Sequence, residues 1–373
     1  MSRFSNLGHR LYQGEVSFDF VGRRKLWYSI SAAIAGAAII GLTVIGLHLG
    51  IEFKGGSVYT VQKPGLSVSQ AQSEINKITG DSTSQVQSTG DGKIRIQVSA
   101  GEKVASDQVV KQLSDDLKVP SSDINAQVVG PSWGHQISQK ALLGLVIFMV
   151  LVTAYLAIAF EWRMAVAALV ALVHDLVITI GVYALVGFEV TPGTVIGFLT
   201  ILGYSLYDTV VVFDTVKENT KNIEKQNKLT YSEAANAGLN QTLVRSLNTT
   251  VVALLPVAGL LFVGGGLLGA GTLNDISLAL FIGLSAGAYS SICVATPLLA
   301  QLKEQTPEMK ALAKRVAQRR AADAKAAAAA EAEGTVTDSA EETVADSVAA
   351  GMVGQRNQPT SRARGKGRPS GKR

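Results

Sequence analysis

Six long apolar segments constrain the fold of this chain more than any other feature. A helix needs about 20 mainly apolar residues to cross a lipid core about 30 Å thick. The 373 residues are 47% hydrophobic and only 17% charged, and the apolar residues gather in blocks, which excludes an ordinary soluble enzyme. We predict a polytopic α-helical membrane protein with six transmembrane helices, within 26–49, 141–160, 164–186, 195–216, 249–268 and 276–299.

The first apolar segment follows Arg23, Arg24 and Lys25, as the core of a secretory signal would. It is longer than the roughly 7–15 apolar residues of such a core, and a whole membrane protein follows it. We therefore expect residues 26–49 to be an uncleaved anchor.

The distribution of Lys and Arg predicts the topology. With six spans, the basic residues near the apolar segments fall on one side, which is the cytoplasmic side of a bacterial plasma membrane. The N-terminal arm 1–25, the loop 217–241 and the tail 303–373 are then cytoplasmic, and 50–139 lies outside. This topology explains the net charge of +5, so no specific nucleic-acid partner is expected.

Residues 50–139, here called the outer domain, alternate strand-like and helix-like patterns. Strands are expected at 57–61, 93–98 and 125–129, and helices at 67–78 and 106–117, with Gly90, Asp91 and Gly92 at a hairpin. The order β, α, β, β, α, β predicts a small α+β domain of the ferredoxin-like type. It contains no His or Cys cluster and no paired carboxylates, which favours docking over catalysis.

Two cytoplasmic segments have weaker patterns. Within 217–241, apolar residues near helical spacing predict a short helix along the membrane surface, namely Tyr231, Ala234, Ala235 and Leu239. In the tail, 309–332 has a composition compatible with a helix. The rest of the tail lacks apolar surface and is expected to be largely disordered and basic.

Asp208 lies inside the fourth apolar segment. A charge near the bilayer centre costs at least about 2.5–3.5 kcal/mol, so an intramembrane Asp is by default a candidate functional residue. Asp175 in the third segment is expected at a similar depth, with His174 beside it. The alternative is a structural role, with Asp208 hydrogen-bonded to Ser205, Thr209 or a neighbouring helix, and Asp175 paired with His174 or another polar neighbour.

Arg245 is the cation available to these carboxylates, and its long side chain would reach either depth. It would alternatively anchor the helix at the cytoplasmic surface. Asp214, one turn from Lys217, is expected at that surface. Because the chain has no GxxxxGK[ST] motif, we expect no ATP hydrolysis, no enzyme activity and no cofactor, with a proton gradient as the energy source.

Five sequence landmarks resemble the SecD/SecF family of the resistance-nodulation-division superfamily. They are LGIEFKGGS at 49–57, VGPSWG at 129–134, HD at 174–175, GYSLYDTVVVFD at 203–214 and NQTLVRSLNTT at 240–250, within a resemblance that covers about 21–302. The resemblance implies that Asp208 is the family's intramembrane proton carrier, with Arg245 as the arginine proposed to work with it. Four positions depart from the usual family pattern: Glu52 replaces Asp in the first landmark, Tyr207 replaces Asn, Thr215 replaces Arg and Ser246 replaces Thr.

The same resemblance implies a role in protein export. Such chains pair with SecD in a twelve-helix unit that assists SecYEG and SecA, and the proton motive force drives late translocation of exported preproteins. Two other functions remain open: a proton-coupled half-transporter of lipid or small molecules, and a non-conducting scaffold of the translocon. The sequence also leaves open whether sodium replaces protons.

Overall fold

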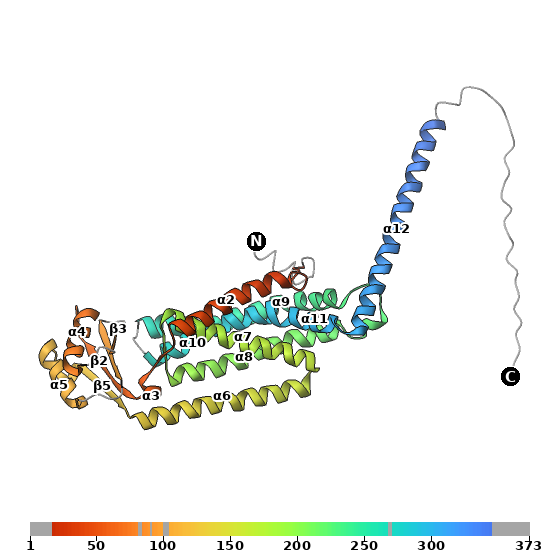
Figure 1. Ribbon diagram of the computed structural model, residues 1–373. Helices are drawn as coiled ribbons and strands as arrows, with labels where there is room; N and C mark the ends of the chain where they lie inside the picture. The colour runs from red at the N-terminus through yellow and green to blue at the C-terminus, as the bar shows by residue number, and fades with distance from the viewer. Residues whose placement is uncertain (1–16, 81–83, 90–91, 100–103, 268–270, 345–373) are drawn as a thin grey trace, which may run out of the picture. The chain divides into compact units, whose positions relative to one another are not determined.

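The computed structural model describes residues 17–80, 84–89, 92–99, 104–267 and 271–344 (Figure 1). The chain forms two compact units, Met1–Val316 and Ala317–Arg373. In the described residues, six helices are long and apolar enough to cross a membrane. The expectation of a polytopic helical membrane protein is thereby confirmed.

The first four spans are single α-helices: α2 (Arg24–Val44), α6 (Pro131–Ala159), α7 (Trp162–Val186) and α8 (Pro192–Asn219). The fifth is α9 (Tyr231–Gly259), extended by a π-helix at Leu260–Leu267. The sixth contains α10 (Gly271–Ser290), a π-helix at Ser291–Ala295 and α11 (Thr296–Glu304). The helix α6 begins ten residues before the predicted apolar segment, because Pro131 is well placed in a first helical turn.

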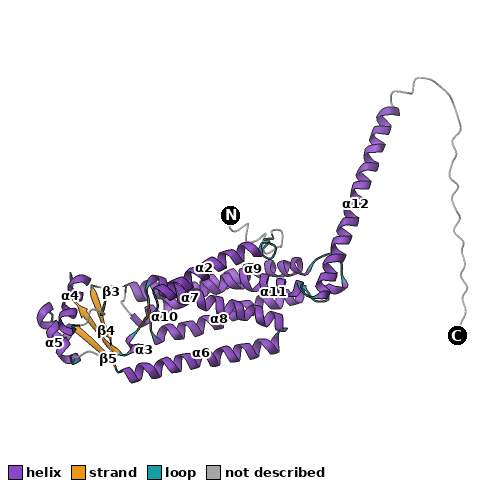
Figure 2. Ribbon diagram, viewed as in Figure 1, coloured by secondary structure: helices purple, strands orange, loops and turns teal. Residues whose placement is uncertain are grey.

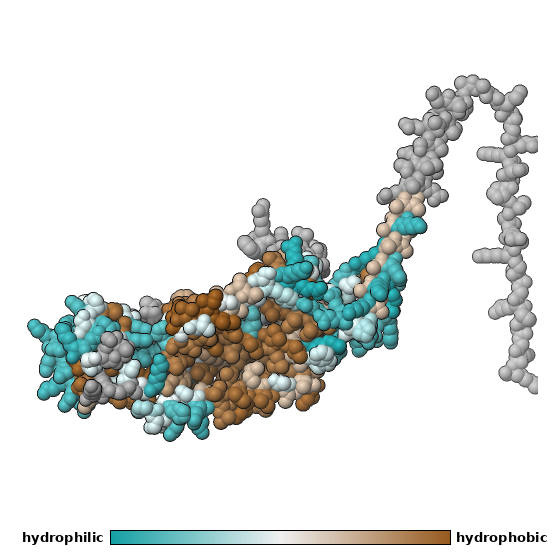
Figure 3. Space-filling view, viewed as in Figure 1, coloured by the Kyte–Doolittle hydropathy of each residue, from teal (hydrophilic) through white to brown (hydrophobic). Residues whose placement is uncertain are grey.

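Close helix contacts in the bundle occur at small residues. A methyl group at Gly181 of α7 would lie 2.1 Å from Cβ of Ala38 on α2. A methyl at Gly283 of α10 would lie 2.2 Å from Ile201 on α8. Small residues allow such approach in membranes, where packing replaces the hydrophobic effect between helices. Apolar side chains cover the outside of the bundle, and polar residues gather at its two ends (Figure 3).

The expected short helix on the cytoplasmic surface is wrong. Residues from Tyr231 onward belong to α9, one 29-residue helix that continues into the fifth span. No glycine or proline interrupts the sequence between Leu239 and Val251, so the helix has no reason to end there. Tyr231, Ala235 and Leu239 are buried in the core of the bundle instead of facing lipid.

The outer domain has its elements in the expected order: β2 (Gly56–Gln62), α4 (Val68–Thr79), β3 (Gln85–Thr89), β4 (Lys93–Ser99), α5 (Ser106–Leu117) and β5 (Ile124–Val129). The strands form an antiparallel sheet with the order β3-β4-β2-β5 (Figure 2). Alternate residues of β4, from Ile94 to Val98, are buried with α4 and α5 in a separate core. Gly90 and Asp91 of the expected hairpin turn lie outside the described residues.

Short elements join the outer domain to the bundle. The strand β1 (His48–Leu49) follows α2 and pairs in parallel with β6 (Glu189–Val190), which lies between α7 and α8. The short helix α3 (Ile51–Lys54) then leads into the sheet. It ends at Gly55 and Gly56, whose φ angles of 78° and 136° disfavour any residue with a side chain.

The described end of the N-terminal arm is fixed to α9. The amide of Phe18 donates a hydrogen bond to Asn240, and the amides of Phe20 and Val21 donate to Asn236. In the tail, α12 (Pro307–Val344) is longer than the helix expected at 309–332, so the prediction of a largely disordered tail is wrong as far as Val344. The Ala, Glu, Lys and Arg of 307–333 have high helix propensity, whereas 334–344 is rich in Gly, Thr, Val, Asp and Ser, and nothing in the structure explains its helix. Residues 345–373 lie outside the description.

Candidate functional site

Asp208 is buried between α8 and α9, with 5% of its surface exposed. The hydroxyl of Ser246 on α9 lies 2.7 and 2.8 Å from its two carboxylate oxygens and donates to them. Ser246 is itself 3% exposed. A buried carboxyl group therefore meets a neutral hydroxyl donor within the membrane-spanning bundle, where an unpaired charge is costly.

Asp175 of α7 is fully buried and forms a second polar centre. Its Oδ2 accepts hydrogen bonds from Ser205 of α8 at 2.5 Å and from Ser290 of α10 at 2.8 Å. The other carboxylate oxygen lies 3.3 Å from Nδ1 of His174. His174 also stacks on Tyr289. Asp175 thus connects three helices through short side-chain hydrogen bonds.

The two polar centres meet at the sixth span. Ser290 contacts Asp175, and the next residue, Ser291, lies 3.0 Å from the hydroxyl of Thr209, beside Asp208 in α8. Ser291 begins the π-helix Ser291–Ala295. Single π-helical turns are frequent at functional sites. Consecutive serines therefore place one polar side chain toward each centre.

The close approach of α10 to α8 depends on a glycine at the same level. A methyl group at Gly287 would lie 2.9 Å from Cβ of Ser205 and 3.1 Å from its Oγ. Because Ser205 donates to Asp175, any side chain at Gly287 would displace this donor.

The other predicted site residues lie at the surface of the bundle. Tyr207 is 56% exposed, and Arg245 and Asp214 are also exposed. Within the described part of the chain, no salt bridge joins Arg245 to Asp208 or Asp175. Arg245 nevertheless adjoins Ser246, the donor to Asp208, on α9. The structure therefore brings together all predicted site residues except these three.

Of the partners considered for Asp208, the structure shows one on a neighbouring helix, Ser246, instead of Ser205 or Thr209. Ser205 contacts Asp175 and not Asp208, and Thr209 contacts Ser291. Ser290 and Ser291 were not predicted at all. Their signal was a pair of adjacent hydroxyls in an apolar span, which is weak because Ser is common at helix contacts in membranes. In the described residues, no group of three His, Cys, Asp or Glu side chains is arranged to hold a metal ion.

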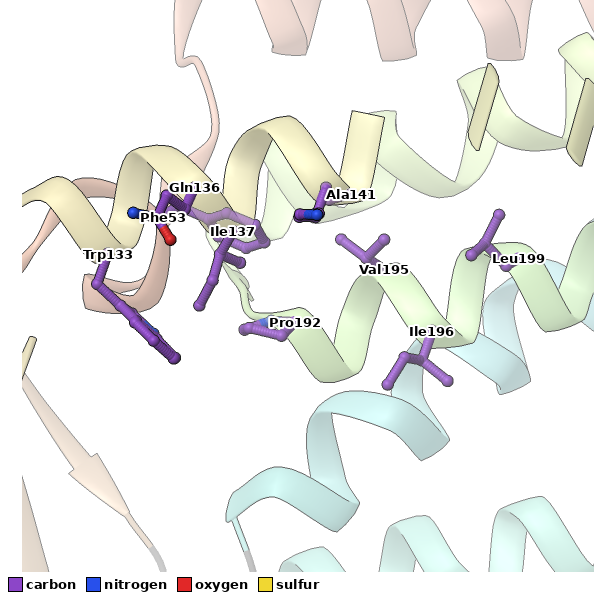
Figure 4. Close-up of a pocket in the computed structure, with 10 residues that line it drawn as sticks. Phe53, Trp133, Gln136, Ile137, Ala141, Pro192, Val195, Ile196 and Leu199 are labelled. Carbon is purple, nitrogen blue, oxygen red and sulfur yellow. The ribbon is translucent and has the colours of Figure 1, made fainter. Parts of the chain in front are cut away.

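A cavity of about 460 Å³ lies between α6 and α8 near the outer domain. Side chains of both helices and Phe53 of α3 line it (Figure 4). The lining is mostly apolar, with Gln136 and Lys140 as its polar members. It contains none of the residues bonded to Asp175 or Asp208 and is a separate feature.

A six-span helical bundle with two buried carboxyl groups and an outer α+β domain defines a polytopic membrane protein. Its sequence matches two family descriptions: "Protein export membrane protein SecD/SecF, C-terminal" over residues 109–305, and "SecD/SecF GG Motif" over residues 40–62. The chain belongs to the SecD/SecF family. It is a multi-pass bacterial membrane protein.

Two relatives show how far this likeness extends. The chain is 60% identical to the protein translocase subunit SecF of Streptomyces coelicolor, over the full length of both chains. It is 42% identical to the corresponding subunit of Mycobacterium tuberculosis, covering 85% of this chain and 75% of that one.

A solved structure has the same fold. The crystal structure of SecDF from Thermus thermophilus, described as a translocon-associated membrane protein, superposes with a TM-score of 0.67 at 28% identity. The match covers 78% of this chain and 39% of that one. This chain therefore spans well under half of the fused protein.

Proposed function

We propose that this chain is the SecF-type subunit of a protein translocase and works with a separate SecD-type chain. The names of the relatives and the full-length match to the Streptomyces coelicolor subunit support this role. The fused SecDF relative, of which this chain spans 39%, supports a SecD-type partner. SecYEG, SecA and exported preproteins are the further partners that a translocon-associated role implies.

The observation that carries the mechanism is the burial of Asp208 against Ser246. A hydroxyl can donate to a carboxylate and can accept from a protonated carboxyl, so Ser246 can stabilise both protonation states. Asp208 is in this proposal the group that takes up and releases protons under the proton motive force. Asp175, held by two serines and His174, supports the same pathway. No enzymatic reaction and no cofactor are needed.

Arg245 and Tyr207 lie at the surface next to Ser246 and Asp208. In a six-span half of a larger unit, such a surface is available to the partner's helices. The SecD-type chain covers this surface in the complex, and Arg245 acts on Asp208 when α8 and α9 shift relative to each other. Lipid covers the remaining apolar surface.

The outer domain is of the ferredoxin-like type in this proposal, because its sheet order β3-β4-β2-β5 and its two crossover helices follow the split βαβ pattern. Residues 50–139 lie on the extracytoplasmic side and both termini are cytoplasmic, as the basic residues outside the spans favour. The domain would then meet exported chains as they leave the channel.

Export by cells whose only copy carries Asp208→Asn tests this function. Asn keeps the size and hydrogen bonding of the side chain but carries no proton. We expect loss of export of a secreted reporter with an intact complex on blue-native gels. Normal export at matched expression would contradict proton-driven translocation and favour the scaffold. Transport of a lipid or small molecule would favour the half-transporter.

A further inference from the structure

Charged side chains from four elements meet where the outer domain joins the bundle. Arg95 of β4 forms a salt bridge with Glu189 of β6, at 3.1 Å between Nη2 and Oε2. Glu52 of α3 and Asp275 of α10 are the other carboxyl groups acting on Glu189. His48 of β1 is the register partner of Glu189. None of these residues takes part in the hydrogen bonds of Asp175 or Asp208.

Glu52 and Glu189 point toward the same small space. A methyl carbon at Gly50 would lie 2.4 Å from Oε2 of Glu52 and 3.1 Å from Oε1 of Glu189. Both oxygens are buried and have no hydrogen-bond partner in the described part of the chain. The side chain of Glu189 is only 10% exposed. Two unsatisfied carboxylate oxygens that point into one buried space repel each other unless one of the carboxyl groups is protonated.

The charges around Glu189 do not balance. Among the described residues, Arg95 is the one guanidinium acting on Glu189, against the carboxyl groups of Glu52 and Asp275. Asp275 is partly satisfied by a hydrogen bond from Thr191 at 3.1 Å. Burial raises the pKa of Glu189 to about 7; Glu52 and Asp275 act in the same direction, and Arg95 opposes them. The ion pair is thus too weak to offset burial and the neighbouring acids.

We propose that Glu52 and Glu189 hold one proton between them at the junction of the outer domain and the bundle, and that release of this proton loosens the outer domain. The carboxyl O–H of one residue donates to the free oxygen of the other, which satisfies both buried oxygens. When the proton leaves to water, the carboxylates of Glu52 and Glu189 remain beside Asp275 with one guanidinium, and separation of the surrounding elements relieves their repulsion. Those elements are β4 and α3 on the outer domain side and β6 on the bundle side.

The direction of the effect follows from proton linkage. Glu189 has a pKa of about 7 in the docked structure and 4.5 as an ordinary exposed group. The docked arrangement therefore binds the proton more tightly than an open one, so protonation favours docking and deprotonation favours opening. The site goes beyond the proposed function, because it would bind a proton even if Asp208 bound none.

Distance measurements on the purified full chain in lipid nanodiscs test the opening. Fluorophores are attached at Ser73→Cys on α4 and Val186→Cys at the end of α7, in a Cys293→Ser background. We expect the distance between them to increase as the pH rises through about 7. In Glu189→Gln, which mimics the protonated residue, the distance stays short at every pH. Glu218→Gln, an exposed change in α8, should behave like the wild type.

Infrared titration of the protonated carboxyl group tests the site itself. Glu52→Gln removes a repulsive charge and should lower the midpoint of the Glu189 band by about one pH unit, whereas Arg95→Gln should raise it by about as much. The opposite signs separate this result from a general loss of fold. Midpoints unchanged in both variants, an equal opening in Glu189→Gln, or a midpoint that depends on sodium would each overturn the proposal. Proton binding by Glu52 and Glu189 together with normal export in the Asp208→Asn variant would refute only the proposed function.

Discussion

The Ser246 hydroxyl lies within 2.8 Å of both carboxylate oxygens of Asp208, so α9 supplies a hydrogen-bond donor to an acidic group buried between α8 and α9. A hydroxyl bridges the two helices without fixing the charge of the carboxyl group, as a cation would. The pair therefore combines contact between two spans with freedom to change protonation state.

Removal of this donor should impair function more than folding. In Ser246→Ala, Asp208 loses a charge-assisted hydrogen bond worth about 1.5–3 kcal/mol, and we expect export of a secreted reporter to fall at least severalfold. Ser246→Thr keeps the hydroxyl and should retain most activity. The matched control is Ser285→Ala, because this exposed serine donates only to its own helix. Equal export in Ser246→Ala and the wild type would show that the donor is dispensable.

Loss of the Asp175 carboxyl group should destabilise the bundle. Asp175→Ala leaves the buried hydroxyl of Ser205 without its acceptor, at a cost of about 1–3 kcal/mol, and leaves Ser290 with only its longer bond to the carbonyl of Gly287. Thermal unfolding in detergent should therefore occur at a clearly lower temperature than in the wild type. Asp214→Ala, an exposed change in α8, provides the comparison and should leave the transition unchanged.

A methyl group at position 287 should separate α10 from α8. Gly287→Ala places its Cβ 2.9 Å from that of Ser205, so we expect overpacking to cost about 1–3 kcal/mol of stability. Gly203→Ala in α8 meets no atom within 4 Å and should be neutral or slightly stabilising. Chemical unfolding of both variants measures the difference, and equal stabilities would refute the close packing at Gly287.

The stability of the chain should decrease as the pH rises from 4.5 to about 7. Burial raises the pKa of Glu189 from 4.5 to about 7, so the folded state binds this proton where the unfolded state has released it. The contribution is fully present below pH 4.5 and is lost by about pH 7. Glu189→Gln should flatten this part of the stability profile in a pH series of unfolding temperatures. An identical slope in the variant would assign the effect to other groups.

The sequence predicted the spans because a lipid core imposes a length and a composition on each helix. It also predicted the order of elements in the outer domain, where strand and helix patterns are local. The extent of α9 was missed because the polar composition of 217–241 favours a loop with a separate short helix, whereas no glycine or proline after Gly238 separates this helix from the fifth span.

The site was predictable only as a set of residues. Asp175 and Asp208 were recognisable singly, because a carboxyl group in an apolar segment is conspicuous. Their partners depend on helix rotation and depth, which one sequence does not encode in a local pattern. Ser205 therefore lies at Asp175 and not at Asp208. The Arg95–Glu189 salt bridge depends on the pairing of β1 with β6, two-residue strands far apart in the chain.

The pairing of β1 with β6 has a mechanical consequence. The strand β1 is the covalent path from α2 to the outer domain, and β6 lies between the end of α7 and the beginning of α8. Tension applied to the outer domain is therefore shared between α2 and the α7–α8 connection, through the parallel strands and the hydrogen bond from Gly50 to Val190. Besides α2, the helices that bear this load are α7 and α8, which carry Asp175 and Asp208, so a force on the outer domain reaches the helices that hold both buried carboxyl groups.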